Sequence, residues 1–256
     1  MKGSFYDGLL AKKGIGKKSL ALLIDPDKVS DMTSLQRLVN HALESRVDYF
    51  FVGGSLITDS NFSQVVQLLK HNSDLPVILF PGSNMHLDPG ADAILFLSLI
   101  SGRNPELLIG QHVLAAPILR KSKLEVASTG YILIDAGNHT TVRYMSNTQP
   151  IPHDKVSVAA CTAMAGEMLG LKLIYLDAGS GAERPVSPRM ISAVRKVIET
   201  PLIVGGGINN GHKAKDALEA GADLLVLGNG VEKNPDLLTE VSDIVYAYNR
   251  TSDVHK

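Results

Sequence analysis

The chain has 256 residues, of which 45% are hydrophobic and 20% are charged, and its formal net charge is −1. This composition is typical of a globular protein with a buried core, and neither the charge nor the aromatic content, which includes no tryptophan, indicates nucleic-acid binding. Cys161 is the single cysteine, which excludes an internal disulfide and fits a reducing compartment.

The first 18 residues are polar and contain glycine, so they lack the apolar run of a signal peptide. No stretch of the sequence approaches the ~20 unbroken apolar residues that a membrane-spanning helix needs. We therefore expect a cytoplasmic protein without a transmembrane segment. A transient contact with a membrane surface is compatible with this expectation.

Short apolar runs recur along the chain, and most are rich in leucine or β-branched residues with almost no polar alternation. Strands that are buried on both faces of a parallel sheet have this pattern. Eight such runs are predicted as strands: Leu20–Asp25, Asp48–Gly53, Pro76–Phe80, Ala91–Leu97, Gly130–Asp135, Lys172–Asp177, Pro201–Val204 and Ala222–Leu227.

Segments with apolar residues at helical spacing lie between many of these strands. The predicted helices are Ser34–Arg46, Ser63–Lys70, Asp154–Leu169, Pro188–Glu199 and Gly211–Ala220. Strands that alternate with helices predict a parallel α/β fold. Eight strands in a chain of this length favour a closed (β/α)₈ TIM barrel, formed as one domain by residues 1–256, over an open doubly wound sheet.

Two connections are irregular. The Phe80–Ala91 interval is too short for a crossover with a helix, which takes at least ~10–12 residues, and its sequence is typical of a loop. We therefore predict a barrel with a missing or irregular third helix, and the gap is either a shortened surface loop or an open groove for a long ligand. The Thr140–Pro152 connection is predicted to lack a helix because of Asn147, Pro150 and Pro152, and it is either a lid over the barrel or a packed loop.

The active site of an α/β barrel lies at the carboxyl ends of its strands. Gly205-Gly206-Gly207-Ile208 follows the seventh predicted strand, and Gly228-Asn229-Gly230-Val231 follows the eighth. Glycine lets the backbone approach a ligand and direct N–H groups at its oxygens, and phosphate sites recur after strands seven and eight of this fold. The two clusters predict a phosphate site, and the alternative is that these glycines only form tight turns.

The sixth predicted strand ends in Tyr175-Leu176-Asp177-Ala178-Gly179-Ser180-Gly181, a third turn of small residues. Asp177 is expected to face the mouth of the barrel, where a carboxylate accepts hydrogen bonds from a polyol or helps to deprotonate a hydroxyl. The alternative is that Asp177 caps the following helix.

Asp25-Pro26-Asp27-Lys28 follows the first predicted strand. Two carboxylates two residues apart suit Mg²⁺, which is commonly held by one or two carboxylates together with phosphate oxygens, and Lys28 adds a positive charge for a phosphate. The alternative is a local turn in which Pro26 sets the backbone angle. Ser55 follows the second strand and adds a hydroxyl to the same rim, with Thr58 close behind it.

Other classes of site find little support. The histidines lie mostly in helical or loop segments, which argues against a Ser-His-Asp triad. His139 is the one expected near the mouth of the barrel, and it either takes part in the reaction or only forms a hydrogen bond within its loop. No spacing of cysteine and histidine resembles a zinc site, and no glycine string matches a dinucleotide-binding fingerprint.

Taken together in this order, the rim motifs resemble those of the geranylgeranylglyceryl phosphate synthases and the related heptaprenylglyceryl phosphate synthases. The resemblance covers nearly the whole chain, although any one motif alone is weakly specific. It is carried by Leu23-Ile24-Asp25-Pro26-Asp27-Lys28, Phe51-Val52-Gly53-Gly54-Ser55, Ile78-Leu79-Phe80-Pro81-Gly82, Tyr175-Leu176-Asp177-Ala178-Gly179-Ser180-Gly181, Val204-Gly205-Gly206-Gly207-Ile208 and Leu227-Gly228-Asn229-Gly230.

The resemblance implies a Mg²⁺-dependent prenyltransferase. Such an enzyme joins sn-glycerol 1-phosphate to a polyprenyl diphosphate, here geranylgeranyl diphosphate, and forms the ether bond of archaeal-type lipids. By matching position, Asp25 and Ser55 would hold Mg²⁺, and the prenyl chain would lie in an apolar groove at the missing third helix. Glycerol 1-phosphate would be held by Tyr175, Leu176, Asp177, Ala178, Gly179, Ser180, Gly181, Gly206, Gly207, Gly228 and Asn229.

One departure from the family pattern matters. Some relatives carry a phosphate-binding lysine just before the first-strand aspartate, where this chain has Leu23 and Ile24, so that role is not implied here. The departure places the chain nearer the larger subgroup of the family, whose members tend to be homo-oligomers.

Two other functions remain as alternatives. An isomerase or lyase acting on a sugar or indole phosphate would share the glycines after strands seven and eight, but it would not need Asp25-Pro26-Asp27 or a missing third helix. A phosphate-binding sensor without activity is the non-enzymatic alternative, and the many polar residues on the rim argue against it.

Overall fold

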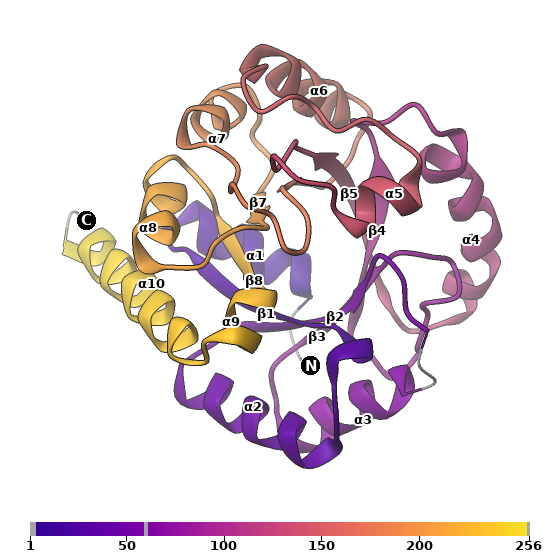
Figure 1. The fold of residues 1–256 in the computed structure, drawn as a ribbon, viewed down its shortest axis with the longest axis vertical. Coiled ribbons are helices and arrows are strands. Elements are labelled where there is room, and N and C mark those ends of the chain that lie inside the picture. Colours follow the sequence, from indigo (N-terminus) through magenta and orange to yellow (C-terminus); the bar gives the residue numbers. More distant parts are fainter. Residues whose placement is uncertain (1–3, 59–60, 255–256) are drawn as a thin grey trace.

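The structure, a computed structural model, describes residues 4–58 and 61–254. Eight parallel strands close into a barrel in chain order, with β8 paired to β1, and helices surround it (Figure 1). The strands are β1 (Ser19–Ile24), β2 (Tyr49–Gly54), β3 (Val77–Pro81), β4 (Ala93–Leu99), β5 (Glu125–Leu133), β6 (Leu173–Asp177), β7 (Leu202–Gly205) and β8 (Leu224–Leu227). The predicted TIM barrel is confirmed.

The helices fill the connections between strands, and several begin at a short polar side chain that accepts a hydrogen bond from a free backbone N–H, as Asp31 does from Ser34. They are α1 (Phe5–Gly14), α2 (Met32–Glu44), α3 (Phe62–Asn72), α4 (Gln111–Lys121), α5 (Thr141–Ser146), α6 (Val156–Met168), α7 (Pro188–Arg195), α8 (Gly211–Glu219), α9 (Asn229–Lys233) and α10 (Asp236–Val254). Two further turns are the 3₁₀ turn η1 (Pro26–Lys28) and the π-helical turn η2 (Glu106–Gly110).

The connection between β3 and β4 is the exception. Residues 82–92, all of which the structure describes, contain no helix. The prediction of a barrel that lacks its third helix is therefore confirmed. The next helical segment along the chain, η2 followed by α4, comes only after β4.

The helix-free interpretation of the Thr140–Pro152 connection was wrong. Thr141–Ser146 forms the short helix α5, and Asn147 ends it by adopting a left-handed conformation, with φ 49°. Asn147 thus terminates the helix and does not prevent it from forming, and Pro150 and Pro152 lie beyond the helix end.

Besides α5, the helices α1, α4, α9 and α10 lie outside the segments predicted to be helical. In α4 the apolar side chains do not fall on one face, because Val113, Leu114 and Ile118 are exposed while Ala115 and Leu119 are buried. This arrangement hides the amphipathic pattern by which a surface helix is recognised.

Side chains alternate along each strand between the barrel interior and the layer beneath the helices. In β2, Phe51 lies in the inner cluster, whereas Phe50 and Val52 pack in the outer one. Helix α1 closes the amino-terminal end of the barrel, since the Phe5 ring packs edge-on against Tyr49 with a centroid distance of 5.1 Å. The opposite end, where the strands finish, carries the polar rim.

No helix in the described part of the chain combines the length and the apolar character needed to cross a membrane.

Candidate active site

A cavity of about 690 Å³ opens at the carboxyl ends of the strands and is lined by residues from all parts of the rim. The sequence predicted a set of site residues, and twelve of them contribute to the lining of this cavity: Asp25, Lys28, Ser55, Tyr175, Asp177, Gly179, Ser180, Gly181, Gly206, Gly207, Gly228 and Asn229. Leu176 and Ala178 do not line the cavity. Because neighbours on a strand point to opposite faces, both pack in the outer core beneath the helices. His139 is exposed and also lies outside the cavity lining.

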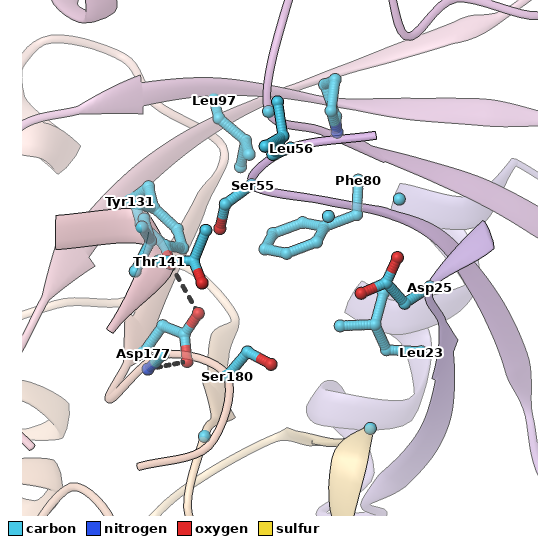
Figure 2. Close-up of a pocket in the computed structure, with 18 of the residues that line it drawn as sticks. Leu23, Asp25, Ser55, Leu56, Phe80, Leu97, Tyr131, Thr141, Asp177 and Ser180 are labelled. Atoms are coloured by element: carbon cyan, nitrogen blue, oxygen red, sulfur yellow. Dashed lines mark hydrogen bonds between the residues drawn. The ribbon is translucent and has the colours of Figure 1, made fainter. Parts of the chain in front are cut away.

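Asp177 is the most strongly held carboxylate of the site. Its Oδ2 accepts a hydrogen bond of 2.5 Å from the Tyr131 hydroxyl, and its Oδ1 accepts one of 2.7 Å from the backbone N–H of Gly179 (Figure 2). Burial raises the pKa of Asp177 above its usual range, while these two hydrogen bonds oppose the rise. Asp177 is thus a fixed carboxylate whose proton affinity is increased by its surroundings.

Aromatic rings surround this carboxylate. The Tyr175 ring lies 5.5 Å from the rings of both Phe80 and Tyr131, measured between centroids. Gly205 makes room for it, since a Cβ there would lie 2.5 Å from the Tyr175 hydroxyl oxygen. The cluster gives the reacting region a wall with little access for water.

Glycines beside Asp177 form a backbone cradle, which consists of Gly179, Gly181, Gly206 and Gly207. All four have φ between 70° and 87°, a region that other residues rarely adopt. A Cβ at Gly206 would lie 2.6 Å from Asp177 Oδ1. The cradle therefore depends on glycine for both its backbone conformation and its space, as a site that brings backbone N–H groups close to an anion requires.

The two carboxylates of the Asp25-Pro26-Asp27 turn have different partners. Asp27 accepts hydrogen bonds from Thr58, at 2.8 Å from its backbone N–H and 2.9 Å from its hydroxyl, and so holds the loop after β2. Within the described residues, Asp25 Oδ1 accepts one hydrogen bond, from the backbone N–H of Asp27 at 3.2 Å. Burial raises the pKa of Asp25, and Lys28 opposes that rise. Asp27 thus holds the loop after β2, whereas Asp25 faces Lys28 and the cavity.

Ser55, the second expected metal ligand, points elsewhere. In Figure 2 its hydroxyl is directed toward Thr141, and the Phe80 ring lies between it and Asp25. The described residues include no cluster of three or more His, Cys, Asp or Glu side chains that could hold a metal. The donor set fits a Mg²⁺ that shares one carboxylate with ligand oxygens and water, and Ser55 would have to turn to join it.

Lys28 joins the two halves of the rim. Its ammonium lies 3.5 Å from Asp25 Oδ2 and 3.3 Å from Glu232 Oε2, and it donates a hydrogen bond to Asn229 Oδ1. Asn229 in turn donates to the Ser180 hydroxyl oxygen at 2.6 Å. The turn after β1 and the segment after β8 meet on the rim because β8 pairs with β1 in the closed barrel.

An apolar groove extends from this polar region toward the helix-free connection after β3. It is lined on one side by residues of that connection, such as Leu87, and on the other by Phe96, Leu107 and Ala115 of β4, η2 and α4. His112 also lines it, and burial lowers its pKa, which favours the neutral ring. Of the two interpretations of the missing helix, the structure supports the open groove.

Two residues of the site were missed by sequence reasoning. Tyr131 falls inside a predicted strand, where a phenol in an otherwise apolar run was the available signal. Glu232 stands two residues after Gly230, at a position where an acidic side chain reaches the rim. Helix α5 also contributes lining residues, among them Met145, so the connection after β5 forms part of the wall.

Comparison with known proteins identifies the family of this site. The PcrB family matches residues 14–245. The geranylgeranylglyceryl phosphate synthase of Spirosoma linguale is 56% identical over 236 residues, which are 92% of this chain and 94% of the relative. That of Chitinophaga pinensis is 52% identical over 247 residues, 96% and 98% of the two chains.

A solved structure gives the same result. The crystal structure of (S)-3-O-geranylgeranylglyceryl phosphate synthase from Thermoplasma acidophilum, in complex with its substrate sn-glycerol-1-phosphate, superposes with a TM-score of 0.89 at 32% identity. The match covers 95% of this chain and 98% of that one. The chain therefore belongs to the PcrB family, together with the geranylgeranylglyceryl phosphate synthases that its rim motifs resemble.

Proposed function

We propose that this protein is a Mg²⁺-dependent prenyltransferase that joins sn-glycerol 1-phosphate to a polyprenyl diphosphate, geranylgeranyl diphosphate in particular. The products are an ether-linked prenylglyceryl phosphate and diphosphate. The observation that carries the proposal is that a glycine cradle and a buried carboxylate adjoin an apolar groove within one cavity. An isomerase or lyase of small phosphates would have no use for that groove.

The acceptor half of the site is the glycine cradle with Asp177 and Ser180. The relative from Thermoplasma acidophilum binds sn-glycerol 1-phosphate. In this chain the phosphate lies against the backbone of the cradle and its neighbours Gly228 and Asn229, and the 3-hydroxyl points at Asp177. Tyr131 and Gly179 fix the carboxylate, so its free lone pairs are directed at the substrate.

The donor half is formed by Asp25 and the apolar groove. Asp25 would hold Mg²⁺, with Ser55 as a further oxygen ligand if its hydroxyl turned, and the cation would neutralise negative charge on the departing diphosphate. The groove past Phe96 and Ala115 receives the prenyl chain and keeps water from the reactive allylic carbon.

The reaction is a substitution at C1 of the prenyl chain. The bond between C1 and the diphosphate oxygen breaks, and the diphosphate leaves with the bonding electrons. The glycerol 3-hydroxyl oxygen forms the new bond to C1, and Asp177 takes the hydroxyl proton. Because burial raises the pKa of Asp177, its carboxylate is a stronger base than an exposed one.

We include a homo-oligomer and a cytoplasmic location in this proposal. The outer face of η2 and α4 exposes Ile109, Val113, Leu114 and Ile118 to between 57% and 62%, an apolar surface suited to a second copy of the chain. The exposed free thiol of Cys161 agrees with a reducing compartment. At the cavity mouth the exposed side chains Leu56 and Met145 are compatible with a transient membrane contact during exchange of the prenyl substrate.

A turnover assay tests the proposal. The wild-type protein is given sn-glycerol 1-phosphate and geranylgeranyl diphosphate with Mg²⁺, and prenylglyceryl phosphate is expected, with loss of turnover in EDTA and its return on adding Mg²⁺. Asp25→Ala should be inactive while circular dichroism shows a folded barrel. Turnover by Asp25→Ala with Mg²⁺, or stabilisation by sugar phosphates in preference to glycerol 1-phosphate in a thermal-shift assay, would contradict the assignment.

A further inference from the structure

The cavity has an unfavourable charge for the substrates proposed above. Among the described residues that line it, the charged side chains are Asp25, Asp27, Asp177, Glu232, Lys28 and Lys233. Four carboxylates therefore face two lysines in a site for two phosphate-bearing molecules. A carboxylate that neither binds a cation nor accepts a proton would only weaken substrate binding there, and Glu232 has neither task in the proposed reaction.

The contacts of Glu232 indicate a role in holding Lys28. Its carboxylate pairs with Lys28 across the contact between the turn after β1 and the helix after β8, at 3.3 Å. Lys28 has three N–H donors, and three acceptors surround it: Glu232 Oε2, Asp25 Oδ2 and Asn229 Oδ1. Of these three acceptors, Asp25 is the most distant, at 3.5 Å, and it is also the proposed ligand of the cation.

The backbone that carries Glu232 is firmly packed. Val231, the preceding residue of α9, is buried, and a Cβ at Gly230 would lie 2.7 Å from Leu237 at the start of α10. Asn234 closes α9 by donating its N–H to the carbonyl of Gly230 at 3.0 Å. Glu232 is therefore presented from a fixed position, as a residue that orients another side chain should be.

We propose that Glu232 is a positioning residue that holds Lys28 between the two halves of the site, where the ammonium donates to the diphosphate of the prenyl substrate. When Asp25 turns to its cation, Lys28 loses one acceptor but stays in place through Glu232 and Asn229, and its third donor is then free for a phosphate oxygen. Without Glu232, Lys28 would pair with Asp25 and compete for the carboxylate that the donor half requires. The inference rests on the proposed function, because it takes the diphosphate as the anion that Lys28 meets.

Glu232→Gln distinguishes positioning from repulsion by the sign of its effect. If Glu232 positions Lys28, the variant raises the KM for prenyl diphosphate about tenfold, the loss expected for one charge-assisted contact, and changes kcat and the KM for glycerol 1-phosphate much less. If the carboxylate merely repels phosphate, the same variant lowers the KM for prenyl diphosphate, and the proposal fails. Asp236→Asn is the matched control, because it removes the same charge from an exposed position that does not line the cavity.

A double variant tests whether Glu232 acts through Lys28. In a Lys28→Met background, Glu232→Gln should no longer raise the KM for prenyl diphosphate, because the side chain to be positioned is gone. An unchanged tenfold rise in that background would overturn the proposal. Glu232→Asp, which keeps the charge, should recover part of the binding in the Lys28 wild-type background.

Binding of inorganic pyrophosphate with Mg²⁺, measured by calorimetry, separates this inference from the proposed function. The wild-type protein should bind pyrophosphate more tightly than Glu232→Gln, and Asp236→Asn should match the wild type. Equal affinities of the wild type and Glu232→Gln would refute the role of Glu232 even if the wild type is an active prenyltransferase. Absence of prenyl transfer by the wild type would instead refute the proposed function, and the pyrophosphate affinities would still decide whether Glu232 positions Lys28.

Discussion

The Tyr131 hydroxyl and the Asp177 carboxylate form a buried hydrogen bond of 2.5 Å at the end of β5 and β6. The register of these strands produces it, because Tyr131 is paired with Tyr175 and Asp177 lies two residues further along β6, on the same inner face. Burial raises the pKa of Asp177, and the Tyr131 hydroxyl lowers it by stabilising the charged form. The proton affinity of the proposed base is therefore set by a residue on the neighbouring strand.

Tyr131→Phe should shift the pH dependence of the reaction. Without the hydroxyl, the pKa of Asp177 rises further, and the carboxylate form that accepts a proton is reached only at higher pH. The acidic limb of the kcat profile should therefore move to higher pH, with the loss of activity greatest at low pH. Tyr175→Phe is the control, since its hydroxyl is not among the groups that set the pKa of Asp177, and its acidic limb should stay in place. An unmoved limb in Tyr131→Phe would show that Asp177 is not the titrating base.

Gly206→Ala should weaken binding of glycerol 1-phosphate beyond what backbone strain explains. Gly206 has φ 79°, and a Cβ there would lie 2.6 Å from Asp177 Oδ1. Gly170→Ala is a matched control, because Gly170 has φ 82° and nothing in the described chain lies within 4 Å of its Cβ position. The left-handed backbone should cost both variants about 1–2 kcal/mol of unfolding free energy. Gly206→Ala should lose more, because its Cβ would also lie 2.7 Å from the backbone nitrogen of Gly179. Only Gly206→Ala should also raise the KM for glycerol 1-phosphate. If both variants change that KM equally, the cradle does not bind glycerol 1-phosphate.

Asp27→Ala should reduce stability more than catalysis. Its carboxylate accepts hydrogen bonds from the N–H and hydroxyl of Thr58, so the variant leaves the loop after β2 without that support. We expect a loss of about 1–3 kcal/mol in urea-induced unfolding, with Mg²⁺-dependent turnover retained. Asp25→Ala should show the reverse, a folded protein without turnover. If both variants abolish turnover while remaining folded, the two carboxylates act together, as the sequence alone indicated.

The sequence predicts the barrel because its strands are defined by local composition. The predicted sixth strand, Lys172–Asp177, differs from β6 by one residue. The fifth strand was predicted to begin at Gly130, but β5 begins at Glu125. The first half of β5 belongs to the strand because residues 125–129 pair with residues 93–97 of β4. Glu125 also accepts hydrogen bonds from the N–H groups of Phe5 and Tyr6 at the start of α1. A contact over 120 residues leaves no trace in a short sequence pattern.

The site residues, like the strands, were predicted where the signal is local in the sequence. Asp177 and the rim glycines were predicted because they directly follow apolar runs, at positions that the fold makes functional. The partners of these residues, Tyr131 for Asp177 and Glu232 for Lys28, depend on which strands are neighbours and in which register. Ser55 lies on the rim as predicted, but the direction of its hydroxyl is a side-chain choice that position alone does not fix.

Ala115→Phe should shorten the space for the prenyl chain. Ala115 is buried and lines the groove between β4 and α4, so a phenyl ring at this position would occupy volume that the chain uses. The variant should raise the KM for geranylgeranyl diphosphate more than that for farnesyl diphosphate, because only the longer chain reaches the blocked part of the groove. Ala116→Phe adds the same ring at an exposed neighbouring position and should change neither KM. Equal increases for the two donors in Ala115→Phe would mean that the prenyl chain does not extend to α4, and the role assigned to the missing third helix would then be wrong.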